Sequence, residues 1–217
     1  MIRMQVGVDE AGRGPVIGPL VVCAFAHPSP NELLALGVKD SKKLSKKKRN
    51  ELFEILIQYE HQVVVCSPLR IDTHGNLNDL EVELFAEALK GLTSHESIML
   101  DACDVDAKRF ARNVSLKSGL DCQAEHGADD NYPIVGAASI IAKVTRDGAI
   151  KELSESLGFD VGSGYPSDPK TIEVLPKLLQ GAKPHDCLRW TWKTVEDAWQ
   201  GKVPVRAGGN SPQQTLF

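Results

Sequence analysis

The chain has 217 residues, 42% of them hydrophobic and 25% charged, and its formal net charge is −4. This composition excludes a chain that is disordered throughout, and the length suffices for one sizeable core with a small appendage. The overall negative charge does not attract nucleic acid, so a nucleic-acid partner would require a local basic patch.

The first half of the chain predicts a β-hairpin followed by isolated strands. Residues 4–9 have the alternation of a strand, and residues 11–15 break it with turn-forming residues. Residues 16–26 are rich in β-formers and predict a second, central strand with a bulge or kink at Gly18 and Pro19. Further strands are predicted at residues 62–66, 98–101 and 121–125.

Helices are predicted between and after these strands. Ser45 is placed to cap a helix that runs to Tyr59, and Asn78 to cap another with an apolar stripe. Asp106 can begin a short helix, and residues 132–157 predict a long helix whose apolar first half is buried. The last helices are predicted at residues 168–179 and 192–199.

These elements predict an α/β fold, a mixed β-sheet flanked by helices with a small helical C-terminal subdomain. We expect residues 1–157 to form the α/β domain and residues 158–200 the helical subdomain. Residues 201–217 are rich in Gly, Pro, Ser and Gln and predict a flexible tail.

The cysteines and the apolar runs indicate the compartment. The five cysteines are odd in number and scattered, which argues against a disulfide framework or a cysteine zinc site and favours a reducing, cytoplasmic environment. We expect all five to be ordinary buried side chains. The longest apolar run, residues 16–26, is shorter than the roughly 20 residues that span a bilayer, and we find no signal-peptide pattern, so no membrane contact is expected.

Four acidic residues stand at the predicted ends of elements: Asp9, Glu10, Asp101 and Asp129. Four carboxylates in one place repel one another unless cations lie between them, and hard oxygen ligands favour Mg²⁺ or Mn²⁺. Because neighbouring strand residues face opposite sides, the first two share a site only if the backbone turns at Glu10. Each acid alone can equally be a solvated charge at a turn, so this hypothesis depends on their meeting in space.

Gly12, Arg13 and Gly14 form a turn next to the first two acids. Such a turn can hold backbone N–H groups against a phosphate or a sugar hydroxyl, although a plain hairpin turn has the same sequence. The chain lacks a third glycine at the spacing of dinucleotide-binding loops and lacks Gly-Lys-Ser/Thr, which excludes dinucleotide and P-loop nucleotide binding.

A basic run and one aromatic residue are candidates for nucleic-acid contact. The run comprises Lys39, Lys42, Lys43, Lys46, Lys47, Lys48 and Arg49, and Lys143 with Arg146 can extend it from the long helix. The alternative for the run is a solvated helix face. Tyr165 lies in a glycine-rich loop, where it can stack on a sugar or base or, alternatively, anchor the loop on the core.

Several sequence blocks together resemble one family. Residues 9–14 (DEAGRG), 40–44 (DSKKL) and 138–143 (ASIIAK) resemble the signature blocks of type 2 ribonuclease H, ribonuclease HII. Residues 162–169 and 189–194 resemble its archaeal and eukaryotic branch. Each block alone is modest, but they occur in order over nearly the whole chain up to residue 200 and together are highly specific.

The resemblance implies an RNase H-like fold and a metal-dependent endonuclease that uses Mg²⁺ or Mn²⁺. It implies hydrolysis of the RNA strand of RNA/DNA hybrids and cleavage 5′ of single ribonucleotides embedded in duplex DNA, which leaves 3′-hydroxyl and 5′-phosphate ends. By motif match, the catalytic, metal-binding carboxylates would be Asp9, Glu10, Asp101 and Asp129. The substrate-binding residues would be Gly12, Arg13 and Gly14 at the 2′-OH, Tyr165 against the sugar of the next nucleotide, and Lys42, Ser139 and Lys143 at phosphates.

One residue departs from the family pattern, and the tail resembles a separate binding motif. Gly127 stands where the family usually has a lysine before its last carboxylate, which removes a cation beside the metal site. In the tail, Gln213, Leu216 and Phe217 resemble the start of a motif that docks replication proteins on the sliding clamp, without its usual aromatic pair; the alternative is a disordered end. We expect a monomer.

Two other functions remain open from the residues. A hybrid-binding module without catalysis would use the basic run and Tyr165 but would not need all four acids. A phosphotransferase of the sugar-kinase type has a related fold and also uses a glycine turn near acidic residues.

Overall fold

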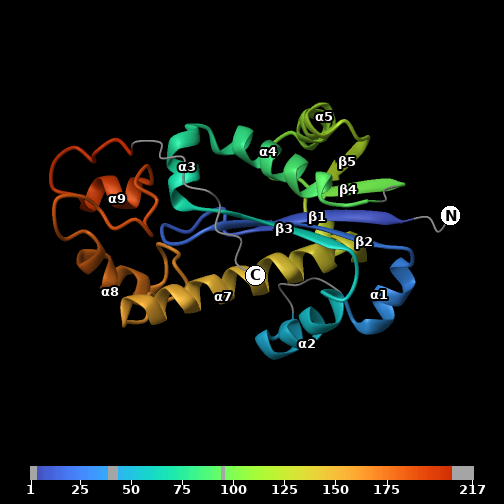
Figure 1. Ribbon diagram of the computed structural model, residues 1–217, viewed down its shortest axis with the longest axis horizontal. Helices are drawn as coiled ribbons and strands as arrows, with labels where there is room; N and C mark the ends of the chain where they lie inside the picture. Colours follow the sequence, from blue (N-terminus) through green and yellow to red (C-terminus); the bar gives the residue numbers. More distant parts are fainter. Residues whose placement is uncertain (1–3, 39–43, 94–95, 207–217) are drawn as a thin grey trace.

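The computed structural model describes residues 4–38, 44–93 and 96–206. A five-stranded sheet with the order β3-β2-β1-β4-β5 lies between two layers of helices (Figure 1). The strands are β1 (Gln5–Ala11), β2 (Leu20–His27), β3 (His61–Cys66), β4 (Ser97–Asp101) and β5 (Cys122–Glu125). The β1–β2 and β2–β3 pairs are antiparallel, whereas β1–β4 and β4–β5 are parallel. The predicted mixed sheet and opening hairpin are therefore confirmed.

The helices cover both faces of the sheet and one of its ends. They are α1 (Pro30–Leu36), α2 (Lys46–Leu56), α3 (Pro68–His74), α4 (Leu77–Lys90), α5 (Ala107–Ser118), α6 (Ala128–Asn131), α7 (Pro133–Leu157), α8 (Pro169–Leu178) and α9 (Lys193–Ala198). Helices α4 and α5 lie on one face, and α7 lies on the other with α1 and α2 (Figure 1). Helices α8 and α9 lie at the end of the sheet near α3.

The contact between α7 and β1 is the centre of the fold. Pro133 occupies the first turn of α7, as predicted, and the apolar residues from Ile134 to Ala142 are buried. A β-carbon on Gly7 of β1 would lie 2.4 Å from the backbone carbonyl carbon of Ile134. Only glycine permits this approach, so Gly7 fixes how closely the helix lies on the strand.

The buried apolar side chains form three clusters. One packs β1 and β2 against α4 and α5 and includes an edge-to-face contact between Phe85 and Phe110. A second packs the other face of the sheet against α7 and α2. The third joins Val16 and Ile17, which follow the glycine turn, to the C-terminal helices and Leu188. The C-terminal segment is therefore attached directly to the loop between β1 and β2.

Some predicted boundaries are wrong for identifiable reasons. The second strand begins at Leu20 and not at residue 16, because Val16 donates its N–H to Gly164 and Gly18 has a positive φ of 87°. The cap of α4 is Asn76, not Asn78, and its side chain accepts two backbone N–H groups. The helix capped by Ser45 ends at Leu56 rather than Tyr59.

Other predictions are confirmed, and some lie beyond the described residues. Three predicted helices are present with ends within one or two residues of the prediction: those at 132–157, 168–179 and 192–199. For α5 only the start was predicted, at Asp106, and it is confirmed. Helices α1 and α3 are too short to give a periodic signal and were not predicted. Lys39, Lys42, Lys43 and the tail motif at residues 213–217 lie outside the described residues. The division into domains stays a prediction.

The burial of the cysteines matches the expectation at four of the five positions. All five cysteines are free; four are buried and Cys103 is half-buried. Within the described part of the chain, none of the helices is both long and apolar enough to cross a membrane.

Candidate active site

Three aspartates come together at the carboxyl end of β1 and β4. Asp9 lies near the end of β1, Asp101 ends β4, and Asp129 lies in α6. Because β1 and β4 are neighbouring parallel strands, their carboxyl ends meet at one edge of the sheet. One carboxylate oxygen from each aspartate lies within 4.8 Å of the others. Asp9 is 4% exposed and Asp129 2% exposed, so the cluster is largely removed from water.

Local hydrogen bonds orient two of these carboxylates. Oδ1 of Asp9 accepts the backbone N–H of Glu10 at 2.7 Å. Oδ1 of Asp101 accepts the backbone N–H of Ala128 at 2.9 Å, which ties β4 to the start of α6. Gly127 precedes that N–H with a left-handed backbone, φ 67°. A glycine adopts this conformation without strain.

Glu10 follows Asp9 on β1 and is not a member of the three-aspartate group. The backbone does not turn at Glu10, because β1 continues to Ala11 in register with Val21 of β2. Glu10 still lines the same cleft, near Arg13, but it is not one of the three carboxylates within 4.8 Å. Its Oε2 is buried and has no hydrogen-bond partner among the residues described.

The acids are in an environment that opposes their charge. Burial, followed by repulsion from Asp101 and Glu10, raises the pKa of Asp9 well above its ordinary value, while a hydrogen bond with Ser139 and the charge of Lys143 oppose this rise. Burial likewise raises the pKa of Glu10. A positively charged ligand among these groups would remove the repulsion, which makes the cluster a suitable cation site.

Basic side chains from two helices approach the acids. Lys143 of α7 places Nζ 3.8 Å from Oδ2 of Asp129 and donates to Oγ of Ser139 at 2.7 Å. Arg49 of α2 lines the same cleft. Lys46, Lys47 and Lys48 of the predicted basic run are exposed on α2. The described part of the run therefore brings one side chain to the cleft and three to the surface beside it.

The glycine turn forms another wall of the cleft, which includes Gly12, Arg13 and Gly14. Gly12 has a φ of 96°, and a β-carbon there would lie 2.5 Å from Nε of Arg146. The Arg13 side chain turns toward α4, where Nε donates to Glu81 at 2.8 and 3.1 Å. Because Glu81 holds the Arg13 side chain, the main chain of the two glycines is what this turn offers to a ligand.

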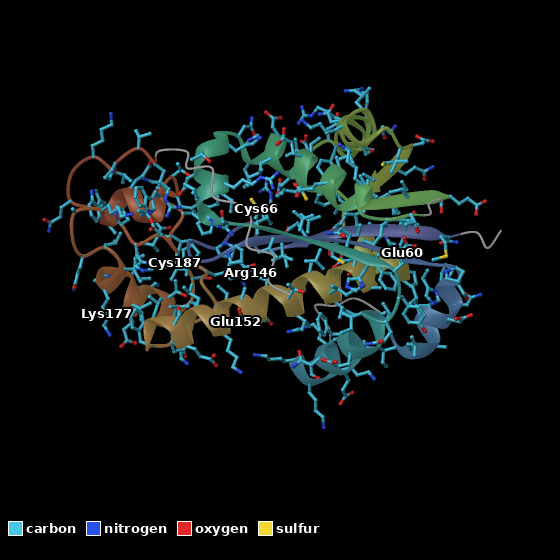
Figure 2. The ribbon with its side chains drawn as sticks, viewed as in Figure 1. Glu60, Cys66, Arg146, Glu152, Lys177 and Cys187 are labelled. Carbon is cyan, nitrogen blue, oxygen red and sulfur yellow. The ribbon has the colours of Figure 1, made fainter. Side chains whose placement is uncertain are left out.

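Tyr165 lies over the same turn and is held by Arg146. The Arg146 guanidinium carbon is 5.2 Å from the centre of the Tyr165 ring, and Nη2 donates to the carbonyl of Ser163 at 2.9 Å. Tyr165 is 38% exposed, and its ring faces Gly14. Figure 2 shows Arg146 between α7 and the strands. Tyr165 is therefore anchored on one side and available to a ligand on the other.

The cleft has a volume of about 430 Å³ and brings together most of the predicted site residues. It contains the four acids, the glycine turn, Lys143 and Tyr165, while Ser139 lies behind Asp9. Sequence reasoning missed Glu81 and Arg189, which contact the glycine turn. Glu81 could have been noticed in the sequence, because it is an acidic residue at a helical spacing that places it on the apolar stripe of α4, four residues after Leu77 and three before Leu84.

Comparisons of sequence and structure with known proteins show which family this chain resembles. A sequence profile for Ribonuclease HII matches residues 6–195. Ribonuclease HII from Methanocorpusculum labreanum is 47% identical over 197 residues, which cover 88% of this chain and 92% of that protein. Ribonuclease H2 from Pyrococcus horikoshii has a TM-score of 0.83 and 43% identity over 89% of this chain and 96% of that one. The PCNA:RNase HII complex from Archaeoglobus fulgidus contains a chain with a TM-score of 0.80 and 43% identity, over 88% and 95%.

The fold and its acidic edge define an enzyme of the RNase H-like class, with a mixed sheet flanked by helices. The extent of the match identifies the member of that class: the chain belongs to the ribonuclease HII family. It is accordingly a hydrolase and an endonuclease, in a family that degrades the RNA of RNA/DNA hybrids.

Proposed function

We propose that this chain hydrolyses the RNA strand of RNA/DNA hybrids and cuts 5′ of single ribonucleotides embedded in duplex DNA, with divalent cations as cofactors. The products carry 3′-hydroxyl and 5′-phosphate ends. The observation that carries this proposal is the cluster of three aspartate oxygens within 4.8 Å of one another, in a cleft walled by a glycine turn.

The donor set fits a hard divalent cation. Asp9, Asp101 and Asp129 would hold it, with Glu10 at the side of the cleft, and all of them offer oxygen only. Mg²⁺ and Mn²⁺ both suit such ligands. When bound, the cations supply the charge that makes water a better nucleophile and stabilises the leaving 3′ oxygen.

The remaining residues bind and orient the substrate. Lys143 and Ser139 lie beside the acids, where a scissile phosphate would be placed, and Arg49 adds a positive charge at the entrance. The main chain of the glycine turn is placed to contact the 2′-OH, the group that distinguishes ribose from deoxyribose. Tyr165 would stack on the sugar of the next nucleotide, so that the junction from RNA to DNA is recognised. We also assign a phosphate contact to Lys42.

We also propose a partner and a cellular setting. The Archaeoglobus fulgidus relative forms a complex with PCNA, and we assign the equivalent contact in this chain to Gln213, Leu216 and Phe217. The function would be ribonucleotide removal from DNA during replication and repair, by a monomer in the cytoplasm.

The test is a DNA duplex with one embedded ribonucleotide, incubated with Mg²⁺, with Mn²⁺ or with EDTA. The proposal expects one cut 5′ of the ribonucleotide that EDTA abolishes. Asp129→Asn should remove cleavage and keep binding, whereas Asp130→Asn, an exposed neighbour outside the cluster, should leave the rate unchanged. Cleavage that survives Asp129→Asn would overturn the metal assignment. ATP-dependent phosphoryl transfer without cleavage would favour the kinase alternative.

A further inference from the structure

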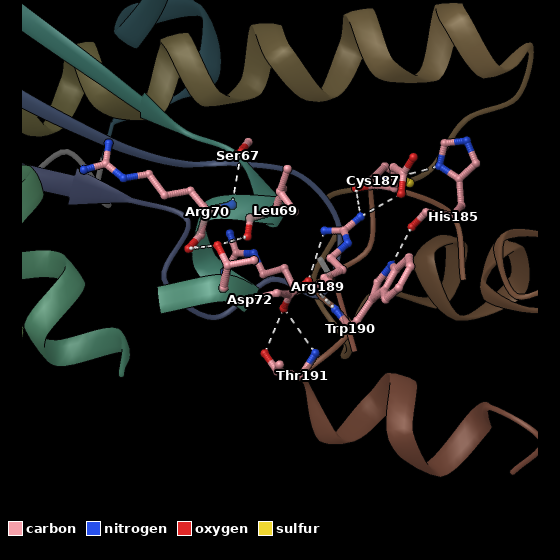
Figure 3. A network of polar contacts seen from close by, with 12 residues as sticks. Ser67, Leu69, Arg70, Asp72, His185, Cys187, Arg189, Trp190 and Thr191 are labelled. Atoms are coloured by element: carbon pink, nitrogen blue, oxygen red, sulfur yellow. Dashed lines mark hydrogen bonds and ion pairs between the residues drawn. The ribbon is translucent and has the colours of Figure 1, made fainter. Parts of the chain in front are cut away.

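Arg189 is a fully buried guanidinium that contacts the glycine turn from behind. It is 0% exposed, and its nitrogens donate to the carbonyls of Gly12 at 2.5 Å, Arg13 at 2.8 Å and Gly18 at 3.1 Å. Figure 3 shows Arg189 beside the hydrogen-bond network that surrounds Asp72. The planar fork of a guanidinium matches successive carbonyls in a way that a lysine cannot, so Arg189 specifies the shape of the turn.

This burial is costly, which argues that the contact has a use. Removing a charge from water is strongly unfavourable unless its hydrogen bonds are replaced, and burial lowers the pKa of Arg189 to about 10. Three neutral carbonyls and the Trp192 ring, whose centre is 4.9 Å from the guanidinium carbon, provide the replacement. An apolar side chain would fill the same space without this cost, but it would not fix the directions of the carbonyls.

A buried carboxyl group on α4 contacts the central side chain of the same turn. Glu81 of α4 is 0% exposed and accepts both hydrogen bonds from Nε of Arg13. Asn78 accepts from Nη2 of Arg13 at 2.7 Å. The main chain of the turn is thus fixed by Arg189, and its central side chain is fixed by Glu81.

We propose that Arg189 and Glu81 are positioning residues that hold the Gly12–Gly14 turn in the conformation that distinguishes ribose from deoxyribose. The inference rests on the proposed function, because it assigns the reading of the 2′-OH to this turn. It adds that the selectivity depends on two buried side chains that do not themselves contact the substrate.

The test measures the affinity of the full-length protein for two duplexes of one sequence, with and without a single ribonucleotide. Binding is measured with Mg²⁺ in the Asp129→Asn background, in which cleavage does not interfere. Arg189→Met should reduce the ratio of the affinity for the ribonucleotide duplex to that for the all-DNA duplex by about tenfold, which is the effect of losing one hydrogen bond to the 2′-OH. The affinity for the all-DNA duplex should stay within about twofold. Arg189→Lys and Glu81→Gln should give intermediate losses of the ratio.

Arg206→Met is the matched control for general destabilisation. The Arg206 side chain is 5% exposed, pairs with Asp72 at 3.0 Å and stacks on Trp190 at 4.3 Å. Its contacts lie in the same C-terminal segment but do not include the glycine turn. This variant should lose thermal stability and keep the affinity ratio. An equal loss of the ratio in Arg206→Met would show a merely structural role for Arg189 and overturn the inference.

The outcomes separate this inference from the proposed function. A wild-type protein that cuts at a ribonucleotide, together with a folded Arg189→Met that keeps the full affinity ratio, overturns the inference alone. A wild-type protein that does not discriminate the two duplexes overturns both. If Arg189→Met does not fold by circular dichroism, full discrimination by both Arg189→Lys and Glu81→Gln overturns the inference.

Discussion

Replacing Asp9 by asparagine should stabilise the cation-free protein while it abolishes cleavage. Asp9 is buried and lies within 4.8 Å of two other carboxylates, and repulsion and burial raise its pKa. Two unit charges at that separation repel by roughly 3 kcal/mol at an effective dielectric constant of about 20. Asparagine removes this repulsion but leaves a polar amide in the buried site, so we expect a smaller net gain of about 2 kcal/mol. Asparagine keeps the Oδ1 acceptor for the N–H of Glu10.

The assay is thermal unfolding in EDTA at pH 8. For a domain of this size, about 2 kcal/mol corresponds to a rise in Tm of about 4–8 °C. Added Mg²⁺ should raise the Tm of the wild type more than that of the variant, because cation binding relieves the repulsion that the substitution has already removed. Asp130→Asn, at an exposed position next to the cluster, should shift Tm by less than about 1 °C. A Tm of Asp9→Asn in EDTA at or below that of the wild type would refute this reasoning.

Three further predictions test other parts of the molecule. Tyr165→Ala should slow cleavage at a single embedded ribonucleotide more than cleavage of a long RNA/DNA hybrid, in which no junction has to be recognised; equal losses in the two rates would contradict junction stacking. Deletion of residues 211–217 should leave cleavage of short oligonucleotides unchanged and weaken capture by the sliding clamp, and unchanged capture would refute the assignment of the tail. Burial raises the pKa of Glu81 from 4.5 to about 8, so its contribution to stability is present below about pH 4.5 and is lost as pH rises toward 8. Glu81→Gln does not titrate, so its Tm should fall less than that of the wild type between pH 5 and pH 9, and parallel profiles would contradict this assignment.

Local sequence signals predicted most of the fold and failed where tertiary contacts decide. The alternation in β1, the cap at Asp106 and the first-turn proline of α7 are local, and the structure confirms all three elements. The start of β2 was wrong because the backbone of Val16 pairs with Gly164, a partner that periodicity in the sequence does not reveal. Helices α1 and α3 begin with Ser-Pro pairs, but with seven residues each they are too short for a helical period.

The same distinction holds for the site. The aspartates could be proposed one by one from their places at element ends, but their meeting depends on β1 pairing in parallel with β4, which the hydrophobic pattern does not specify. The glycine turn was visible in the sequence, whereas its supports come from 68 residues away at Glu81 and 176 residues away at Arg189. A buried ion is costly on its own and is tolerated only with its partners in place. Such residues are therefore the hardest to assign from sequence, and the shape of the recognition turn depends on them.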